Sequence, residues 1–182
     1  QVQVEHYVIS SGLREIIDGT AIAGAFTKIY ASEFYYGGAG APVWPRLAVN
    51  FTAKTQFVYR INKGVLEVCD DKPLNDSMPD DSKRVLFTNM IYMGDGLSDV
   101  PCMKMMRAYG GQAIAVYQAA NRPAVERLLR QGRVDFIYPA DYREGTALER
   151  TVQDIIRKIA VAQRLREENT RQLRSVGTEA AP

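Results

Sequence analysis

Three short stretches of the chain hold side chains whose types and spacing could do chemistry. Each stretch stands where a strand is expected to end or a helix to begin. Polar side chains at such points can meet at one edge of a sheet. Hydroxyls beside a glycine can bind an oxyanion, an ammonium can neutralise one, and paired carboxylates can hold a hard metal ion. The residues are Ser10, Ser11 and Gly12, then Lys54, then Asp95 with Asp99.

Ser10 and Ser11 follow the apolar run "HYVIS", where a strand is expected to give way to a helix. Free backbone N–H groups and the helix dipole at such a point favour an anion. Gly12 would let an oxyanion approach the backbone closely. A plainer interpretation is also open, because a serine at this point can simply cap the helix.

The stretch "GDGLSD" carries two carboxylates, Asp95 and Asp99, after the apolar run "NMIYM". Its glycines permit a tight turn and leave Asp95 uncrowded. Hard oxygen ligands in a turn suit Mg²⁺, which needs only one or two protein carboxylates. Helix capping by Ser98 or Asp99 is the alternative, but it does not account for Asp95.

Lys54 opens a predicted helix that ends near Gly64. A positive charge at a helix N-terminus is unfavourable against the dipole. Its presence there indicates a negative partner nearby, either a carboxylate or a phosphate, although a lone lysine can also be structural.

The surrounding elements alternate between strands and helices. The strands "HYVIS", "NMIYM", "QAIAVY" and "VDFIYP" are short and apolar, and helical patterns separate them. This order predicts an α/β fold with a doubly wound, mainly parallel sheet, whose ligands bind beyond the carboxyl ends of the strands. Leu13, Ile16 and Ile17 are expected on one face of the first helix.

A β-hairpin and a long helix complete the predicted elements. "KIYASEFYY" and "APVWPRLAVN" flank the turn-rich "GGAGA", and Pro42 and Pro45 favour an edge position for the second arm. We expect the aromatic side chains of this hairpin, Trp44 among them, to pack on the domain. The methionines, Met93 included, are expected in the core.

The chain divides into three predicted regions. Residues 1–145 form the core, and residues 146–174 form one amphipathic helix of roughly 40 Å. Residues 175–182 are expected to be disordered. The helix is expected to pack on the sheet in its first half, and it could mediate a homodimer.

Composition excludes several classes of function. The 182 residues carry a net charge of +2, which argues neither for nor against a nucleic-acid partner. No basic block stands out, and no such partner is expected. Cys69 and Cys102 lack metal-ligand spacing and suit a reducing compartment, so a cytoplasmic setting is expected. A single histidine, His6, argues against a histidine-based metal site or triad. Apolar runs are too short for a membrane span.

Taken together and in order, these stretches resemble the haloacid dehalogenase superfamily of hydrolases, nearest to its phosphoserine-phosphatase-like members. "VISSG" resembles the second motif of that family, "NFTAKTQFVYRINKG" the third and "MIYMGDGLSD" the fourth. The last motif is the most specific of the three. The order and spacing of all three motifs strengthen the resemblance. The resemblance covers about Val4 to Tyr138, and the long C-terminal helix lies outside it.

The resemblance implies a Rossmann-like core, Mg²⁺ as cofactor and a small phosphorylated substrate. Ser10, with Ser11 beside it, would hydrogen-bond the phosphoryl oxygens, and Lys54 would neutralise charge near the nucleophile. Asp95 would bind Mg²⁺, and Asp99 would hold the metal's waters or Lys54. The implied reaction is attack of an aspartate on a phosphomonoester, followed by hydrolysis of the aspartyl-phosphate.

One departure from the family limits what this chain can do by itself. The family's first motif, Asp-x-Asp at the end of a central strand, supplies the nucleophile, and this sequence lacks it. We therefore expect an incomplete core and an inactive chain, with the missing segment supplied by a longer protein or a second chain. The alternative is a non-catalytic relative that binds a metal or an anion, or that has a regulatory role.

Overall fold

The structure is a computed structural model that describes residues 2–178. Its strands form two separate sheets of three strands each, ordered β1-β2-β3 and β4-β5-β6. The strands are β1 (Tyr7–Leu13), β2 (Lys28–Tyr36), β3 (Pro42–Leu47), β4 (Ile91–Gly94), β5 (Gln112–Tyr117) and β6 (Phe136–Pro139). The α-helices are α1 (Arg14–Asp18), α2 (Lys54–Lys63), α3 (Asp71–Asn75), α4 (Val100–Ala108), α5 (Arg122–Arg130) and α6 (Ala147–Thr178).

The first sheet combines a parallel pair with a hairpin. β1 runs parallel to β2, and β2 turns back into antiparallel β3. Pro42 and Pro45 lie in β3, which forms the edge of the sheet, so the predicted hairpin and the predicted place of its prolines are confirmed. Proline is tolerated there because an edge strand leaves one row of backbone groups unpaired.

The second sheet is entirely parallel and has helices on both faces. β5 lies between β4 and β6, and its central residues Ala113–Val116 are buried. Helices α4 and α5 supply apolar side chains to one cluster, and α6 covers the opposite face of β5 through Leu148 and Ile155. This half therefore has the layered α/β arrangement that the strand–helix alternation predicts.

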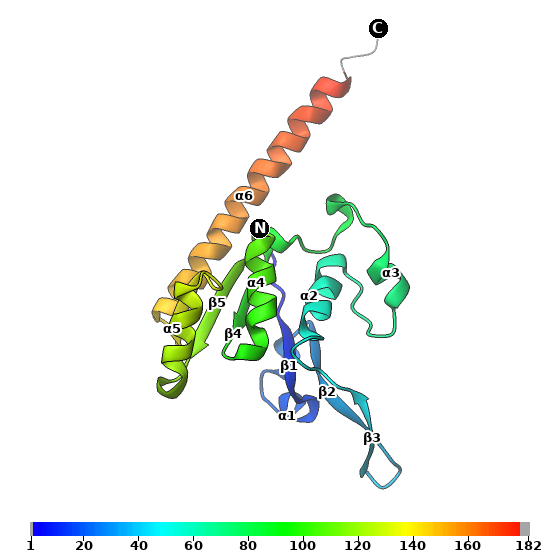
Figure 1. Ribbon diagram of the computed structural model, residues 1–182. Coiled ribbons are helices and arrows are strands. Elements are labelled where there is room, and N and C mark those ends of the chain that lie inside the picture. Colours follow the sequence, from blue (N-terminus) through cyan, green and yellow to red (C-terminus); the bar gives the residue numbers. More distant parts are fainter. Residues whose placement is uncertain (1, 179–182) are drawn as a thin grey trace.

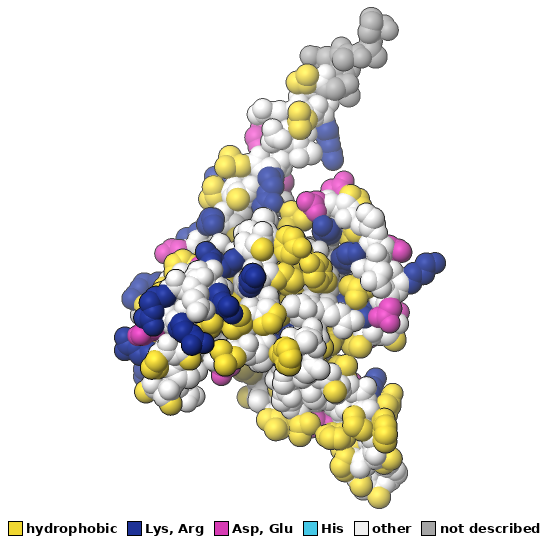
Figure 2. All heavy atoms as spheres, viewed as in Figure 1, with side chains coloured by type: hydrophobic (Ala, Val, Ile, Leu, Met, Phe, Trp, Pro, Cys, Tyr) yellow, Lys and Arg dark blue, Asp and Glu magenta, His cyan; other side chains and the backbone are white. Residues whose placement is uncertain are grey.

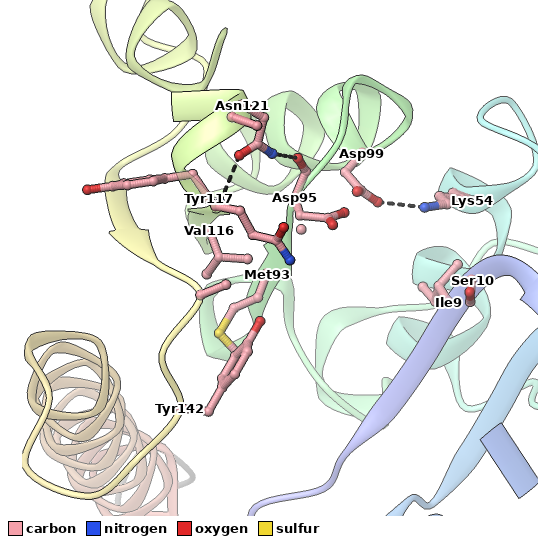
Figure 3. A pocket seen from close by; sticks show the side chains of 14 residues that line it. Ile9, Ser10, Lys54, Met93, Asp95, Asp99, Val116, Tyr117, Asn121 and Tyr142 are labelled. Carbon is pink, nitrogen blue, oxygen red and sulfur yellow. Dashed lines mark hydrogen bonds and ion pairs between the residues drawn. The ribbon is translucent and has the colours of Figure 1, made fainter. Parts of the chain in front are cut away.

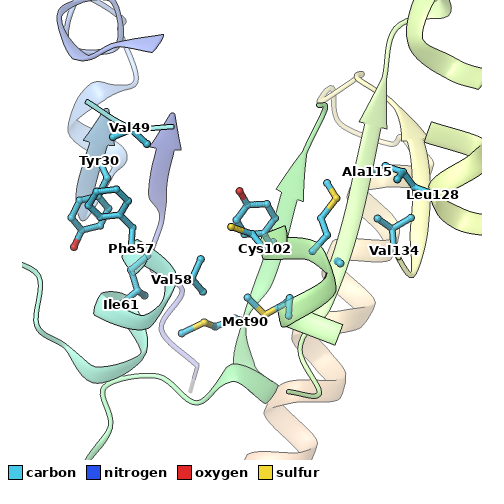
Figure 4. Packing of buried hydrophobic residues seen from close by; sticks show 14 of the residues in the cluster. Tyr30, Val49, Phe57, Val58, Ile61, Met90, Cys102, Ala115, Leu128 and Val134 are labelled. Carbon is cyan, nitrogen blue, oxygen red and sulfur yellow. The ribbon is translucent and has the colours of Figure 1, made fainter. Parts of the chain in front are cut away.

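One hydrophobic cluster joins the two sheets. It includes Tyr30 of β2, stacked on Phe57 of α2 at 4.5 Å between ring centroids, and it reaches Met103 of α4. Figure 4 shows Val58 and Met90 of this cluster lying between the side of the molecule that holds β1 and the side that holds β4. The core is therefore shared, although the hydrogen-bonded sheet is not continuous.

The expectation of one doubly wound sheet is met only in part. The fold is α/β, but no strand among the described residues pairs with the free edge of β1 or of β4. The two edges face each other across a groove, and both strands run in the same direction (Figures 1 and 4).

Two local predictions were wrong. Helix α1 spans only Arg14–Asp18 and has no buried residue, and Ile16 is 69% exposed. A helix this short makes little more than one turn and cannot present an apolar stripe to a core. Met93 is 45% exposed because, as the last residue but one of β4, it faces a cavity rather than the core.

The hairpin arm exposes aromatic side chains that were expected to pack on the domain. Trp44 is 70% exposed, and Tyr35 and Tyr36 are at least half exposed. Figure 2 shows hydrophobic side chains gathered on this arm. The arm extends away from the core, so its tip has no surface of the described chain to cover it.

Helix α6 continues far beyond the sheet on which it starts (Figure 1). Leu148 and Ile155 are buried, whereas Leu165 and Leu173 are more than 60% exposed, as expected for a helix that packs with its first half. The helix runs through Thr178, so the first residues of the predicted disordered tail are helical. The rest of that tail, 179–182, lies outside the described residues, and pairing of two copies through α6 stays a prediction.

Candidate functional site

A cavity of about 680 Å³ opens at the carboxyl ends of β1, β4 and β5 (Figure 3). Its wall brings together residues that lie far apart in the sequence. They are Ile9, Ser10, Lys54, Met93, Gly94, Asp95, Asp99, Val116, Tyr117, Gln118, Ala120, Asn121, Ala140 and Tyr142. Four of the six predicted site residues thus meet in one cavity, at the sheet edge where an α/β fold places ligands.

Lys54 and Asp99 form a buried ion pair at the centre of this site. Lys54 Nζ donates to Asp99 Oδ1 at 2.7 Å, and each side chain is only 7% exposed. Lys54 Nζ also lies 3.4 Å from Ser98 Oγ. The negative partner expected for this lysine is therefore the Asp99 carboxylate. This ion pair joins α2 to the loop after β4.

Asp99 is held in place from several sides. Tyr92 Oη donates to Asp99 Oδ1 at 2.7 Å, and the Gly96 N–H points to Oδ2 at 3.4 Å. Gly94 provides the space for this carboxylate, because a Cβ at that position would lie 2.6 Å from Asp99 Cγ. Asp99 is the N-cap residue of α4 but makes no side-chain hydrogen bond to that helix, and its carboxylate instead faces the Gly96 N–H of the preceding turn.

Asp95 lies in the turn between β4 and α4 and lines the cavity. Its backbone carbonyl accepts a hydrogen bond from Asn121 Nδ2 at 3.1 Å. Asn121 Oδ1 accepts in turn from the Gln118 N–H at 2.8 Å, which ties the loop after β5 to the loop after β4. The Asp95 main chain is thus anchored while its side chain faces the cavity (Figure 3).

The three residues of the second motif are placed differently from one another. Ser10 lines the cavity, and its Oγ accepts a hydrogen bond from the Gly12 N–H at 3.0 Å. Ser11 and Gly12 do not line it. All three belong to β1, which continues to Leu13 through an irregularity in its pairing with β2. The expected handover to a helix N-terminus at Ser10 and Ser11 was wrong, and neither serine caps α1.

The side of the cavity opposite Lys54 carries neutral groups. Tyr142, in the loop after β6, and Met93 of β4 stand there (Figure 3). Burial, and to a smaller extent the charge of Asp95, raise the pKa of Tyr142, so its hydroxyl remains a neutral donor. The part of a ligand that reaches this wall would meet aromatic and apolar surface.

Sequence reasoning missed Tyr92, Asn121 and Tyr142. Asn121 follows the end of a predicted parallel strand, so its position at the ligand edge was a usable signal. Tyr92 gave none, because it lies within an apolar strand where an aromatic residue is ordinary core.

The donor set fits a hard divalent cation in part. No group of three or more His, Cys, Asp or Glu able to hold a metal is found within residues 2–178. Asp95 and Asp99 nevertheless line one cavity, and Mg²⁺ accepts one or two carboxylates with waters completing its shell. The residues present therefore suit Mg²⁺ better than a metal that requires a full protein cage.

The two cysteines are free, with Cys69 exposed and Cys102 buried. Burial raises the pKa of the Cys102 thiol to about 11, so it acts as a small apolar side chain, as expected from the sequence. Within the described residues, no helix combines the length and apolar character needed to cross a membrane.

Comparison with known proteins gives one informative similarity. The chain is 28% identical over 171 residues to an uncharacterized protein of Borreliella burgdorferi. The match covers 85% of this chain but only 58% of that relative, so the chain spans less than two thirds of the relative's length. No family model and no solved structure matches.

Proposed function

We propose that this chain supplies most of the active site of a Mg²⁺-dependent phosphomonoesterase of the haloacid dehalogenase type. The observation that carries the proposal is the meeting of Ser10, Lys54, Asp95 and Asp99 in one cavity, although they come from three distant stretches. The buried Lys54–Asp99 pair links two of those stretches directly. The proposed chemistry requires these four side chains to lie together. Their order along the chain does not by itself bring them together.

Each side chain has a defined task in this proposal. The Lys54 ammonium is available to balance charge on a phosphoryl oxygen, and the Ser10 hydroxyl can donate to another. Asp95 and Asp99 would hold the metal, directly or through its waters. When bound, Mg²⁺ would stabilise the charge that develops on the transferring group. The neutral wall at Tyr142 would receive the organic part of the ester.

The balance of charge supports a divalent cation. Among the residues that line the cavity, Asp95 and Asp99 are acidic and Lys54 is basic, so negative charge is in excess. Such a cavity would by itself repel a phosphate. A bound divalent cation reverses the sign of the excess and makes the cavity attractive to an anion.

The nucleophile must come from elsewhere, because both lining carboxylates are assigned to the metal and to Lys54. The open groove between β1 and β4 offers a place for it. The groove measures about 560 Å³, and apolar side chains line it on two sides. Val58, Ile61 and Met106 come from α2 and α4, whereas Val152, Ile156 and Ile159 come from α6.

A parallel strand fits this groove by its chemistry. It would pair with the free edges of both β1 and β4 and join the two sheets into one. Apolar side chains on both of its faces would cover the two apolar walls. Its carboxyl end would emerge beside Ser10 and Gly94, where a nucleophilic aspartate is needed. We propose that a segment of a longer protein occupies this position.

A non-catalytic relative is the second candidate. It is favoured by one observation, which is that no carboxylate among the described lining residues is left to act as nucleophile. Such a protein would bind a metal or an anion without turnover. The complete gene product discriminates the two, because only an enzyme would carry Asp-x-Asp in the strand that fills the groove. A cytoplasmic setting is proposed for either, on the basis of the unpaired cysteines.

The test is turnover of p-nitrophenyl phosphate by the complete gene product with and without Mg²⁺. We expect Mg²⁺-dependent hydrolysis and a loss of at least about a hundredfold in Asp95→Asn, because the variant removes a metal ligand. Asp154→Asn, at an exposed position on α6, is the matched control and should retain full activity. A gene product that hydrolyses no phosphomonoester with Mg²⁺ would refute the enzyme and favour the binding protein.

A further inference from the structure

Tyr92 holds an unusual place beside the site. It lies in β4, is 8% exposed and does not line the cavity, so it cannot touch a ligand there. Its hydroxyl nevertheless donates to Asp99 Oδ1 at 2.7 Å. The same oxygen accepts from Lys54 Nζ, also at 2.7 Å. A buried hydroxyl thus shares its acceptor with the lysine of the site.

The two oxygens of Asp99 are therefore not equivalent. Oδ1 is occupied by two short hydrogen bonds, whereas Oδ2 has only the long 3.4 Å contact from the Gly96 N–H. Oδ2 lies close to Gly94, since a Cβ at that position would lie 2.7 Å from it, and both Gly94 and Asp99 line the cavity. Oδ2 is thus the oxygen left with spare acceptor capacity.

We propose that Tyr92 is a positioning residue, which locks Asp99 so that Oδ1 holds Lys54 and Oδ2 serves the ligand site. This inference rests on the proposed function, because it assigns a task to Asp99 within that site. Without the Tyr92 hydroxyl, Oδ1 would keep a single donor, and the carboxylate could turn and exchange its oxygens. Lys54 would then lose its fixed position as well.

The Tyr92 hydroxyl is suited to this task because it is buried and makes a short hydrogen bond to Asp99 Oδ1. A tyrosine in the core also fixes the direction of the donor, because its ring is held by packing.

The chain offers a matched pair of variants. Tyr92→Phe removes the hydroxyl and keeps the ring, and Lys54 still satisfies Oδ1, so the variant should fold. Tyr30→Phe is the control, since Tyr30 is fully buried and its hydroxyl donates to the Leu66 carbonyl at 2.9 Å, away from the cavity. Both variants lose one buried hydroxyl, and only the first loses a contact with the site.

Two measurements on the complete gene product test the proposal. The first is acetylation of Lys54 by acetic anhydride, followed by mass spectrometry and referred to exposed Lys104. We expect Tyr92→Phe to raise labelling of Lys54 several-fold and Tyr30→Phe to leave it unchanged. The second is p-nitrophenyl phosphate turnover, for which we expect Tyr92→Phe to lower kcat about tenfold with KM changed less than about twofold.

The outcomes separate this proposal from the proposed function. Unchanged labelling of Lys54 in Tyr92→Phe would overturn the positioning role, whatever the activity. An equal rise in both variants would also overturn it, since general loosening would then explain the effect. If the wild-type protein shows no turnover while labelling rises only in Tyr92→Phe, the phosphatase fails and the positioning of Asp99 stands.

Discussion

The loop after β4 and the end of β1 face the same cavity, but they are held in different ways. Asp99 accepts hydrogen bonds from Lys54 of α2 and Tyr92 of β4, and Asn121 anchors the Asp95 backbone. The Ser10 hydroxyl accepts a local bond from the Gly12 N–H, and the Ser11 carbonyl accepts one from Ser32 Oγ of β2 at 3.2 Å. The loop after β4 is thus held by side chains from several elements, whereas the end of β1 is held through its pairing with β2.

This difference follows from where each strand lies. β4 pairs with β5, whose central residues Ala113–Val116 are buried, and α2 and α4 pack over the loop that follows β4. β1 has its free edge at the groove, and the α1 helix that follows has no buried residue. A site built from the loop after β4 and the end of β1 is therefore preorganised on one side. In the proposed function, a strand in the groove completes the other side.

The largest expected effect is on the buried ion pair. Asp99→Ala leaves the Lys54 ammonium buried without a partner, which should lower the free energy of unfolding by about 3–5 kcal/mol. Urea unfolding measures this free energy. Asp154→Ala, which breaks an exposed pair with Arg157, should change the free energy of unfolding by less than about 1 kcal/mol. Equal losses of stability in the two variants would contradict the conclusion that buried contacts hold the loop after β4.

The two glycines next to the site sharpen the comparison. Gly94→Ala would place a Cβ 2.6 Å from Asp99 Cγ, whereas in Gly12→Ala the nearest atom is Ser10 Oγ at 3.3 Å. We expect Gly94→Ala to cost about 1–3 kcal/mol and Gly12→Ala less than about 1 kcal/mol, since a serine hydroxyl can rotate away. Thermal unfolding compares them. A larger loss of stability in Gly12→Ala than in Gly94→Ala would show that the end of β1, and not the loop after β4, is the more tightly packed.

Ser10→Ala is expected to separate stability from activity. The hydroxyl bonds only a neighbouring N–H in a part-exposed position, so unfolding should change by less than about 1 kcal/mol. Turnover by the complete gene product should fall about tenfold or more, because a donor to the phosphoryl group is lost. Ser11→Ala, outside the cavity, is the matched control and should keep its activity.

A further expected effect concerns pH. The pKa of Cys102 rises from 9.0 to about 11 in the folded chain, mainly because the thiol is buried. The folded state then binds this proton more tightly than the unfolded state does, so its stabilising contribution is present below pH 9 and is lost as the pH rises to about 11. Urea unfolding between pH 8 and 11 should show a decline that is smaller in Cys102→Ala. Identical curves would exclude this thiol as a contributor.

The sequence predicted correctly that Asp95 and Asp99 follow a buried strand, and both line one cavity. "MIYMGDGLSD" allowed this because an apolar run followed by a glycine turn has few other structures. Lys54 was flagged by its unfavourable place at a helix start, and its partner is Asp99. The pairing itself depends on how α2 packs against α4, which no local pattern encodes.

The sequence was less informative at β1. This strand was expected to end at Ser10, yet it continues to Leu13, and α1 buries no residue. The predicted doubly wound sheet, expected to be incomplete, is divided in two, because β1 and β4 have no strand between them among the described residues. Tyr92 drew no prediction, since hydrophobic periodicity cannot show which buried hydroxyl meets a carboxylate.

The most direct test of the account is amide hydrogen exchange along β1 and β4 in the complete gene product. The account holds that a strand fills the groove and completes the cavity. It therefore predicts slow exchange at the amides of both strands, including those that do not bond β2 or β5, at a level similar to central β5. Fast exchange at those amides, at the level of the free edge of β3, would show an open groove and contradict the account.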